Sequence, residues 1–182
     1  MASSVQLPLS TGTGAAAGAL RHLGFRISGW SRSPKDIAGI ECFHGSGQID
    51  AFLRQTDILV SLLPFTPDTH HILNRGLFAK LNRNNPLGAP VLINAGRGGL
   101  QNEADILACL DDGTLGAVSL DVFASEPLPP DSRFWTHPKV ILTPHNAADT
   151  DADEISKYVA QQIERFEAGQ ALENVVDPAR GY

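Results

Sequence analysis

Short apolar runs alternate with amphipathic stretches along the chain, which is typical of stacked β-α units. The apolar runs predict strands at residues 25–30, 40–43, 57–63, 89–93, 115–122 and 139–143. The other stretches predict helices at residues 15–23, 49–54, 69–73, 75–81, 103–110 and 151–168. Strands that are apolar along nearly their whole length indicate a sheet covered on both faces. The expected fold class is therefore α/β, a doubly wound parallel sheet of the kind that binds a dinucleotide.

Two of the predicted helices have clear end signals or a clear apolar face. Asn102 is placed to cap the helix at 103–110, and Gly113 stops it. The last helix ends at Gly169. Its apolar face consists of Ile155, Tyr158, Val159, Ile163 and Phe166.

Three polar residues follow three of the predicted strands: Arg97, Glu126 and His145. In a parallel α/β sheet the carboxyl ends of the strands converge on one crevice, so residues distant in sequence meet there. A fixed cation, a carboxylate and an imidazole in one crevice are suited to the reduction of a 2-oxo acid. The alternatives are a surface arginine in a glycine turn, a surface glutamate and a loop histidine without a catalytic role.

The chemistry explains why these residue types fit. Hydride arriving at a ketone carbon leaves charge on the oxygen, and an imidazolium can deliver the proton near neutral pH. A neighbouring carboxylate favours the charged imidazolium, which is the role expected for Glu126 beside His145. A guanidinium grips a carboxylate with a planar, permanently charged fork, and Arg97 lies between two glycines that allow a close approach.

Composition narrows the function classes. The 182 residues carry a net charge of −6 without a basic block, which argues against nucleic acid as a partner. No apolar run is long enough to cross a membrane, and residues 1–13 lack the features of a signal peptide. Cys42 and Cys109 are isolated, which favours buried thiols in a reducing compartment and a cytoplasmic location. No metal site is expected, because His70 and His71 would point to different faces of a helix.

Several motifs in a fixed order match a known family. They are residues 30–33 (Trp-Ser-Arg-Ser), 62–69, 94–98, 121–129, 135–148 and 176–182. From about residue 15 to its end, the chain resembles the NAD(P)-dependent D-2-hydroxyacid dehydrogenases, in particular their glyoxylate/hydroxypyruvate reductase branch. The resemblance implies a Rossmann-type NAD(P)-binding domain and reduction of a small 2-oxo acid to the 2-hydroxy acid.

The resemblance also implies a role for each matching residue. Arg97 would hold the substrate carboxylate and carbonyl, His145 would be the acid/base, and Glu126 would be its partner. Asp121 would contact the nicotinamide side of the cofactor, although a carboxylate at a strand end could instead cap local backbone amides. The cofactor groove would be lined by Leu63, Pro64, Thr69, Ala95, Gly96 and Ala147.

The turn after the second predicted strand bears on the choice of cofactor. An acidic residue there would select NAD, whereas an arginine suits the 2′-phosphate of NADP. The turn contains Ser31, Arg32 and Ser33, and the serines add neutral donors. NADP is therefore the expected cofactor, with NAD as the alternative.

The N-terminal part departs from the family pattern. A first domain of about a hundred residues, an ordinary domain size, is expected ahead of the nucleotide-binding segment, and none of it is present. The glycines of the phosphate-binding turn would fall at Pro8, Ser10 and Thr13, and Pro8 would interrupt the first strand. We expect an atypical segment at residues 1–13, an NAD(P)-binding domain at 14–168 and a tail at 169–182, without an intact first strand.

Two alternatives to a 2-oxo acid reductase remain open at this point. One is a catalytically inactive, truncated dinucleotide-binding fragment. The other is a related D-2-hydroxyacid dehydrogenase of the phosphoglycerate or lactate type. Without the first domain, the apolar face of the last helix would be exposed and would favour self-association, so a homodimer is also considered.

Overall fold

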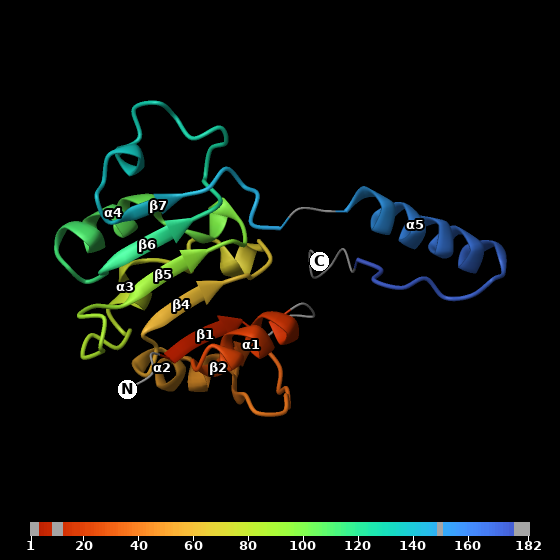
Figure 1. Cartoon of the computed structure of the whole chain (residues 1–182), viewed down its shortest axis with the longest axis horizontal. Helices are drawn as coiled ribbons and strands as arrows, with labels where there is room; N and C mark the ends of the chain where they lie inside the picture. The colour runs from red at the N-terminus through yellow and green to blue at the C-terminus, as the bar shows by residue number, and fades with distance from the viewer. Residues whose placement is uncertain (1–3, 9–12, 149–150, 177–182) are drawn as a thin grey trace. The chain divides into compact units, whose positions relative to one another are not determined.

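The computed structural model describes residues 4–8, 13–148 and 151–176. Within these ranges a seven-stranded parallel sheet has the order β3-β2-β1-β4-β5-β6-β7 (Figure 1). This order, in which the direction of winding reverses after β3, is that of a doubly wound fold. The strands are β1 (Ser4–Pro8), β2 (Arg26–Ser31), β3 (Glu41–His44), β4 (Ile58–Ser61), β5 (Val91–Asn94), β6 (Ala117–Leu120) and β7 (Val140–Leu142).

The helices connect these strands, as the alternating pattern predicts. The α-helices are α1 (Thr13–His22), α2 (Gly45–Arg54), α3 (Arg75–Phe78), α4 (Glu103–Asp111) and α5 (Ala152–Glu167). Short 3₁₀ helices are η1 (Pro67–Thr69), η2 (Gly98–Leu100) and η3 (Arg133–Trp135). The predicted cap of α4 is confirmed, because the Asn102 side chain accepts a hydrogen bond from the Asp105 amide at 3.1 Å.

The predicted helix at residues 69–73 is wrong. A capping box between Thr66 and Thr69 closes the single 3₁₀ turn η1 instead. Leu73 then forms an isolated parallel bridge with Gln101, and Asn74 caps α3. Residues 70–73, between the 3₁₀ turn and α3, are therefore not helical.

The first strand is present, contrary to the expectation that Pro8 would interrupt it. β1 pairs with β2 from Ser4 to Pro8, and with β4 at Val5 and Gln6. Pro8 is the last residue of the strand, where the missing amide donor matters least. The strand is thus present over five residues, and the sheet is continuous from β3 to β7.

The first compact unit ends at Pro144, and its main core lies on one face of the sheet. Leu59, Leu92 and Val118 occupy neighbouring register positions on β4, β5 and β6 and are all buried. α2, α3 and α4 supply further buried residues of this core, including Phe52, Phe78, Ile106 and Leu110.

A second compact unit begins at His145. The residues after α5 fold back along it, since the Glu173 amide donates to Gln162 Oε1 at 2.8 Å and Asn174 Nδ2 donates to the Tyr158 hydroxyl at 2.8 Å. The expectation of an exposed apolar face on the last helix is confirmed: Phe166 is 72% exposed, and Ile155, Val159 and Ile163 are exposed as well. No helix within the described ranges has the length and apolar character of a membrane span.

Candidate active site

The loops that follow β4, β5 and β6 are joined to one another at the carboxyl edge of the sheet. The Ala95 amide donates to the Ser61 carbonyl at 3.1 Å, which links the ends of β4 and β5. The Asp121 amide donates to the Asn94 carbonyl at 3.0 Å, which links β5 to β6. Residues from three separate parts of the sequence therefore lie along one edge.

Two fully buried amide side chains shape the loop that carries Arg97. Asn94 Oδ1 accepts from the Gly96 amide at 3.1 Å, and Asn94 Nδ2 donates to Gln101 Oε1 at 2.8 Å. Gln101 Nε2 in turn donates to the Val122 carbonyl at 3.0 Å. Both side chains are 0% exposed, and buried polar groups that are hydrogen-bonded hold a conformation firmly. These two buried side chains thus hold the turn around Arg97 in its conformation.

The same turn packs tightly against the loop that carries Glu126. A side chain at Gly98 would overlap the backbone carbonyl of Phe123, so only glycine fits there without a shift of the backbone. Glu103 Oε1, at the start of α4, accepts from the Ala124 amide at 2.9 Å. The Arg97 loop and the Glu126 loop therefore form one hydrogen-bonded assembly.

Arg97 and Glu126 themselves are exposed on this assembly. Arg97 is the residue before η2, and its Nη1 donates to the Gly96 carbonyl at 2.7 Å. Glu126 Oε1 accepts from the Phe123 amide at 2.9 Å, which fixes the carboxylate relative to its own loop. A permanent cation and an oriented carboxylate thus stand on two loops that are held together.

Asp121, at the end of β6, is buried and hydrogen-bonded. Its Oδ1 accepts from the Thr143 hydroxyl at 2.5 Å. Thr143 follows β7, and its amide donates to the Leu120 carbonyl at 3.1 Å. The hydroxyl at the end of the neighbouring strand thus orients this carboxylate. The expectations for Asp121 are a cofactor contact or a backbone cap, and neither of them includes this hydroxyl.

The residues expected at the adenosine ribose lie at the end of β2, and three residues expected in the cofactor groove follow β4. Ser31 is buried and donates to the Ser33 carbonyl at 2.7 Å, which shapes the turn that exposes Arg32. Leu63 and Pro64 are half-buried after β4. Thr69 Oγ1 donates to the Pro64 carbonyl at 2.9 Å and closes this second turn.

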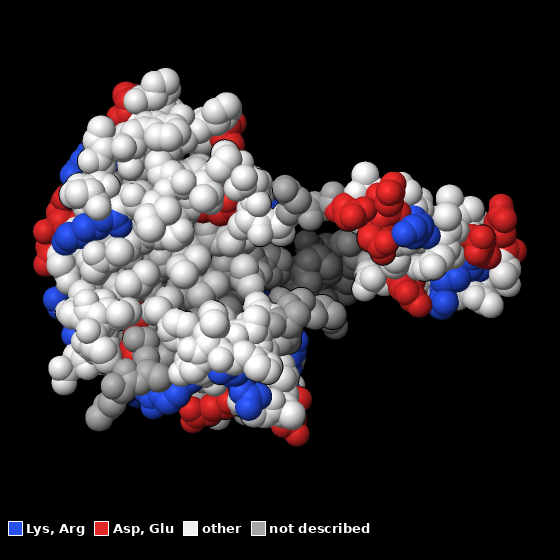
Figure 2. Space-filling model, viewed as in Figure 1, with Lys and Arg blue, Asp and Glu red and all other residues white. Residues whose placement is uncertain are grey.

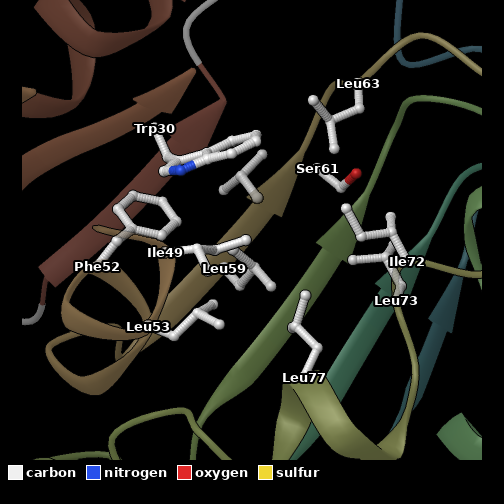
Figure 3. A pocket seen from close by; sticks show the side chains of 11 residues that line it. Trp30, Ile49, Phe52, Leu53, Leu59, Ser61, Leu63, Ile72, Leu73 and Leu77 are labelled. Carbon is white, nitrogen blue, oxygen red and sulfur yellow. The ribbon is translucent and has the colours of Figure 1, made fainter. Parts of the chain in front are cut away.

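An apolar cavity opens between these elements, with about 420 Å³ of empty volume including the space at its mouth. Figure 3 shows Trp30 and Phe52 on one side of it, Ile72 and Leu77 on the other, and Leu63 near its upper end. Ser61 also lines it, and among the described residues Ser61 Oγ is the buried side-chain polar atom that lacks a hydrogen-bond partner. An unpartnered hydroxyl at an apolar cavity is suited to a hydrogen bond with a bound cofactor, so the residues present are compatible with a dinucleotide.

Gly96 lies where the turn after β5 approaches the turn after β4. A side chain there would come within 2.9 Å of the Leu63 carbonyl, so the bare backbone keeps the turns after β4 and β5 close together. Ala95, on the same turn, is half-buried. Ser10, one of the positions expected in the phosphate-binding turn, lies outside the described residues.

His145 and Ala147 belong to the second unit. His145 is exposed and has a φ of 56°, in the left-handed region that non-glycine residues seldom adopt. Ala147 is exposed. The grouping of His145 with Arg97 and Glu126 remains a prediction from the sequence.

The two cysteines lie on β3 and α4. Cys109 is buried in the main core, as the sequence predicts, and its burial raises the pKa of the thiol. Cys42 is a free, half-buried thiol. Among the described residues, no three His, Cys, Asp or Glu side chains form a group that could hold a metal ion.

Sequence reasoning missed the residues that support the site. They are Ser61, Asn94, Gln101, Glu103 and Thr143. For Ser61 and Asn94 a signal exists, since each is a polar residue at the end of an apolar strand, where burial without a partner is costly. Gln101 and Glu103 give no such signal, because their partners Val122 and Ala124 lie about twenty residues away in sequence.

Comparisons with known proteins place this fold and these motifs in one family. The family model described as D-isomer specific 2-hydroxyacid dehydrogenase, NAD binding domain, matches residues 11–147. Glyoxylate/hydroxypyruvate reductase A of Yersinia enterocolitica is 43% identical over 163 residues, which cover 90% of this chain and 50% of that protein. The corresponding protein of Salmonella paratyphi B is 45% identical over 166 residues, covering 91% and 52%.

Solved structures agree with this result. The NADPH-dependent glyoxylate/hydroxypyruvate reductase of Sinorhizobium meliloti, in complex with NADP and sulfate, superposes with a TM-score of 0.96 at 53% identity, covering 100% of this chain and 57% of that one. A D-isomer specific 2-hydroxyacid dehydrogenase of Xanthobacter autotrophicus Py2 with NADPH gives 0.92 at 38% identity, covering 100% and 73%. The chain spans about half the length of the reductases it matches. With its doubly wound sheet and the loops at the carboxyl edge, this chain belongs to the D-isomer specific 2-hydroxyacid dehydrogenase family and comprises its NAD-binding domain.

Proposed function

We propose that this chain is the cofactor-binding part of a reductase that uses NADPH to convert a small 2-oxo acid, such as glyoxylate or hydroxypyruvate, into the 2-hydroxy acid. The observation that carries the proposal is the joined pair of loops that present Arg97 and Glu126 at the carboxyl edge of the sheet. The reductases named above, up to 53% identical, support the same substrate class.

In this proposal two side chains act on the substrate, and a third supports one of them. Arg97 binds the carboxylate and polarises the carbonyl through its guanidinium fork. His145 delivers a proton to the carbonyl oxygen, and the Glu126 carboxylate favours the charged imidazolium before that transfer. The cofactor supplies the hydride when it is bound.

Residues on four loops would hold the cofactor. Asp121, oriented by Thr143, accepts a hydrogen bond from the carboxamide at the nicotinamide end. The groove would be lined by Leu63, Pro64, Thr69, Ala95, Gly96 and Ala147. At the adenosine ribose, Arg32 binds the 2′-phosphate with Ser31 and Ser33 beside it, which favours NADPH over NADH.

A second candidate is a dinucleotide-binding unit that turns over no substrate. The chain spans about half the length of the reductases it matches. A reductase of this family needs a cleft that closes over the substrate and excludes water from the hydride transfer. The two candidates share the cofactor site and differ only in turnover.

The test separates binding from turnover. Calorimetric titration of the purified chain with NADPH and NADH measures binding, and oxidation of NADPH at 340 nm in the presence of glyoxylate or hydroxypyruvate measures turnover. Arg97→Lys is expected to remove most turnover while leaving NADPH affinity unchanged, whereas Arg83→Lys, on a loop away from the carboxyl edge, is expected to change neither. Binding without turnover in the unmodified chain favours the second candidate, and absence of both refutes the proposal.

Substrate class, assembly and location belong to the same proposal. A panel that includes 3-phosphohydroxypyruvate and pyruvate distinguishes the glyoxylate type from the phosphoglycerate and lactate types. We propose a homodimer because apolar side chains of the sheet and of α5 are exposed. A cytoplasmic location agrees with the two free cysteines.

A further inference from the structure

Arg32 has a partner that the proposed cofactor role does not use. Its Nη2 forms an ion pair with Asp68 Oδ2 at 3.1 Å. Arg32 follows β2 and Asp68 lies in η1 after β4, and these two strands flank β1 in the sheet. The pair therefore bridges two loops at the carboxyl edge, where the cofactor is expected.

Hydrogen bonds of the neighbouring residues hold the backbone around Asp68 in place. The Thr66 amide donates to Thr69 Oγ1 at 2.8 Å, and that hydroxyl donates to the Pro64 carbonyl at 2.9 Å. Asp68 lies between these two threonines on a closed 3₁₀ turn. The closed turn thus holds the backbone of Asp68, whose carboxylate contacts the side chain that would bind the 2′-phosphate.

The ion pair contributes little to the fold. The side chains of Arg32 and Asp68 are 62% and 77% exposed, and exposed pairs of this kind add little to stability. A phosphate monoester carries a charge of about −1.5 to −2 near neutral pH. Asp68 therefore competes with such a phosphate for the guanidinium and also repels it.

We propose that Asp68 is a specificity-determining residue that weakens binding of the 2′-phosphate and so limits the preference of this chain for NADPH over NADH. The proposal rests on the proposed function, in which Arg32 meets the 2′-phosphate. Asp68 touches neither the substrate nor the reacting carbon of the cofactor, so its effect belongs to affinity rather than to turnover.

The test is equilibrium binding of NADPH and NADH to Asp68→Asn, measured by titration calorimetry at low salt. The variant keeps the size of the side chain and removes its charge. We expect NADPH to bind about three- to tenfold more tightly, from the Coulomb energy of charges several ångströms apart in water, and the gain to shrink at high salt. Affinity for NADH is expected to stay unchanged.

Asp111→Asn is the matched control, because Asp111 forms an exposed pair with Arg133 at 3.0 Å at the end of α4. This control is expected to change neither affinity. The double variant Arg32→Ala/Asp68→Asn is compared with Arg32→Ala. The gain for NADPH should be smaller in this pair, since competition for the guanidinium is gone and only the repulsion by Asp68 is removed.

The outcomes separate this proposal from the one on which it rests. If the unmodified chain binds NADPH and Asp68→Asn binds it equally or more weakly, the role of Asp68 is refuted while the proposed function stands. An equal gain for NADPH and NADH also refutes it, because the effect then does not involve the 2′-phosphate. If neither dinucleotide binds to the unmodified chain, both proposals fail.

Discussion

The two faces of the sheet in the first unit have similar sequences and different surroundings. On one face, Leu59, Leu92 and Val118 lie side by side and are buried under helices. On the other face, Val60, Ile93 and Ser119 occupy the next register positions and are only half-buried. Ile141, beside Ser119 on β7, is 64% exposed.

Within the first unit, the described residues cover the open face only in part. Ile58, Val60 and Leu62 pack beside the small cluster of Ala17 and Ile27 under α1. Beyond them, Figure 2 shows a largely uncharged surface over β4, β5 and β6. Apolar residues on both faces of a strand thus indicate a sheet that is suited to cover on both sides. The burial that each face reaches depends on which helices pack against it.

The largest expected difference between the faces is the cost of truncation. Leu92→Ala, in the closed core, should lower the free energy of unfolding by about 2–5 kcal/mol, because it leaves a cavity among packed side chains. Ile93→Ala, the adjacent residue on the open face, should cost less than about 1.5 kcal/mol, because water already reaches it. Urea unfolding monitored by circular dichroism measures both.

The control for this pair of variants is the state of association of the protein at the concentration used. If Ile93→Ala costs as much as Leu92→Ala, the open face is covered in solution. Sedimentation at the concentration used for unfolding would then detect an assembly. Equal costs in a monomer would contradict the structural difference between the two faces.

The same contrast explains how far the sequence predicts the fold. Apolar runs located the strands β2 to β7, since a buried parallel strand requires such a run whichever face is covered. The prediction of a helix at 69–73 was wrong, because the local hydrogen bonds of the caps at Thr66, Thr69 and Asn74 outweigh the apolar spacing. The prediction that the first strand is interrupted was wrong, because Pro8 occupies the last position of β1. The position of a residue within a strand depends on the register of pairing rather than on composition.

For the candidate site, the sequence predicts the residues that face a ligand better than those that support them. Arg97 and Asp121 are conspicuous, since each is a charged residue directly after an apolar strand. The contact of Gly98 with Phe123, and the bond from Gln101 to Val122, join segments that are separate in sequence. Their pairing follows only from the three-dimensional arrangement of neighbouring strands.

Gln101→Leu tests whether the stability of the first unit depends on buried polar contacts as well as on apolar ones. The substitution keeps the volume and removes the bonds to Asn94 and Val122, leaving buried polar groups without partners. We expect a loss of about 1–3 kcal/mol in unfolding free energy. Gln48→Leu, on the surface of α2, removes one bond to the His44 amide and should cost less than about 1 kcal/mol. Similar values for the two would argue that the Asn94–Gln101 pair does not hold the Arg97 loop.

Two glycines give a matched test of the tight contact between the loops. Gly98→Ala would place a methyl group on the Phe123 carbonyl, so the two loops must separate, at a cost of about 1–3 kcal/mol. In Gly47→Ala, on α2, the added methyl group has no atom within 4 Å, and the helix should gain up to about 1 kcal/mol. Thermal unfolding of both variants measures the difference. A stabilising Gly98→Ala would mean that the loops are not in contact in solution.

The smallest expected effect is at the opposite edge of the sheet, after α4. A hydrogen bond with Thr114, aided by Arg75, lowers the pKa of Asp112 from 3.8 to about 2. Because the folded-state pKa is below the ordinary value, the stabilisation from Asp112 is fully present above about pH 4 and is lost as the pH falls towards 2. Asp112→Asn should therefore flatten the dependence of unfolding free energy on pH within this window and leave it unaltered between pH 5 and 8. A profile that stays parallel to that of the unmodified protein from pH 4 to 2 would show that the carboxylate does not keep these bonds in solution.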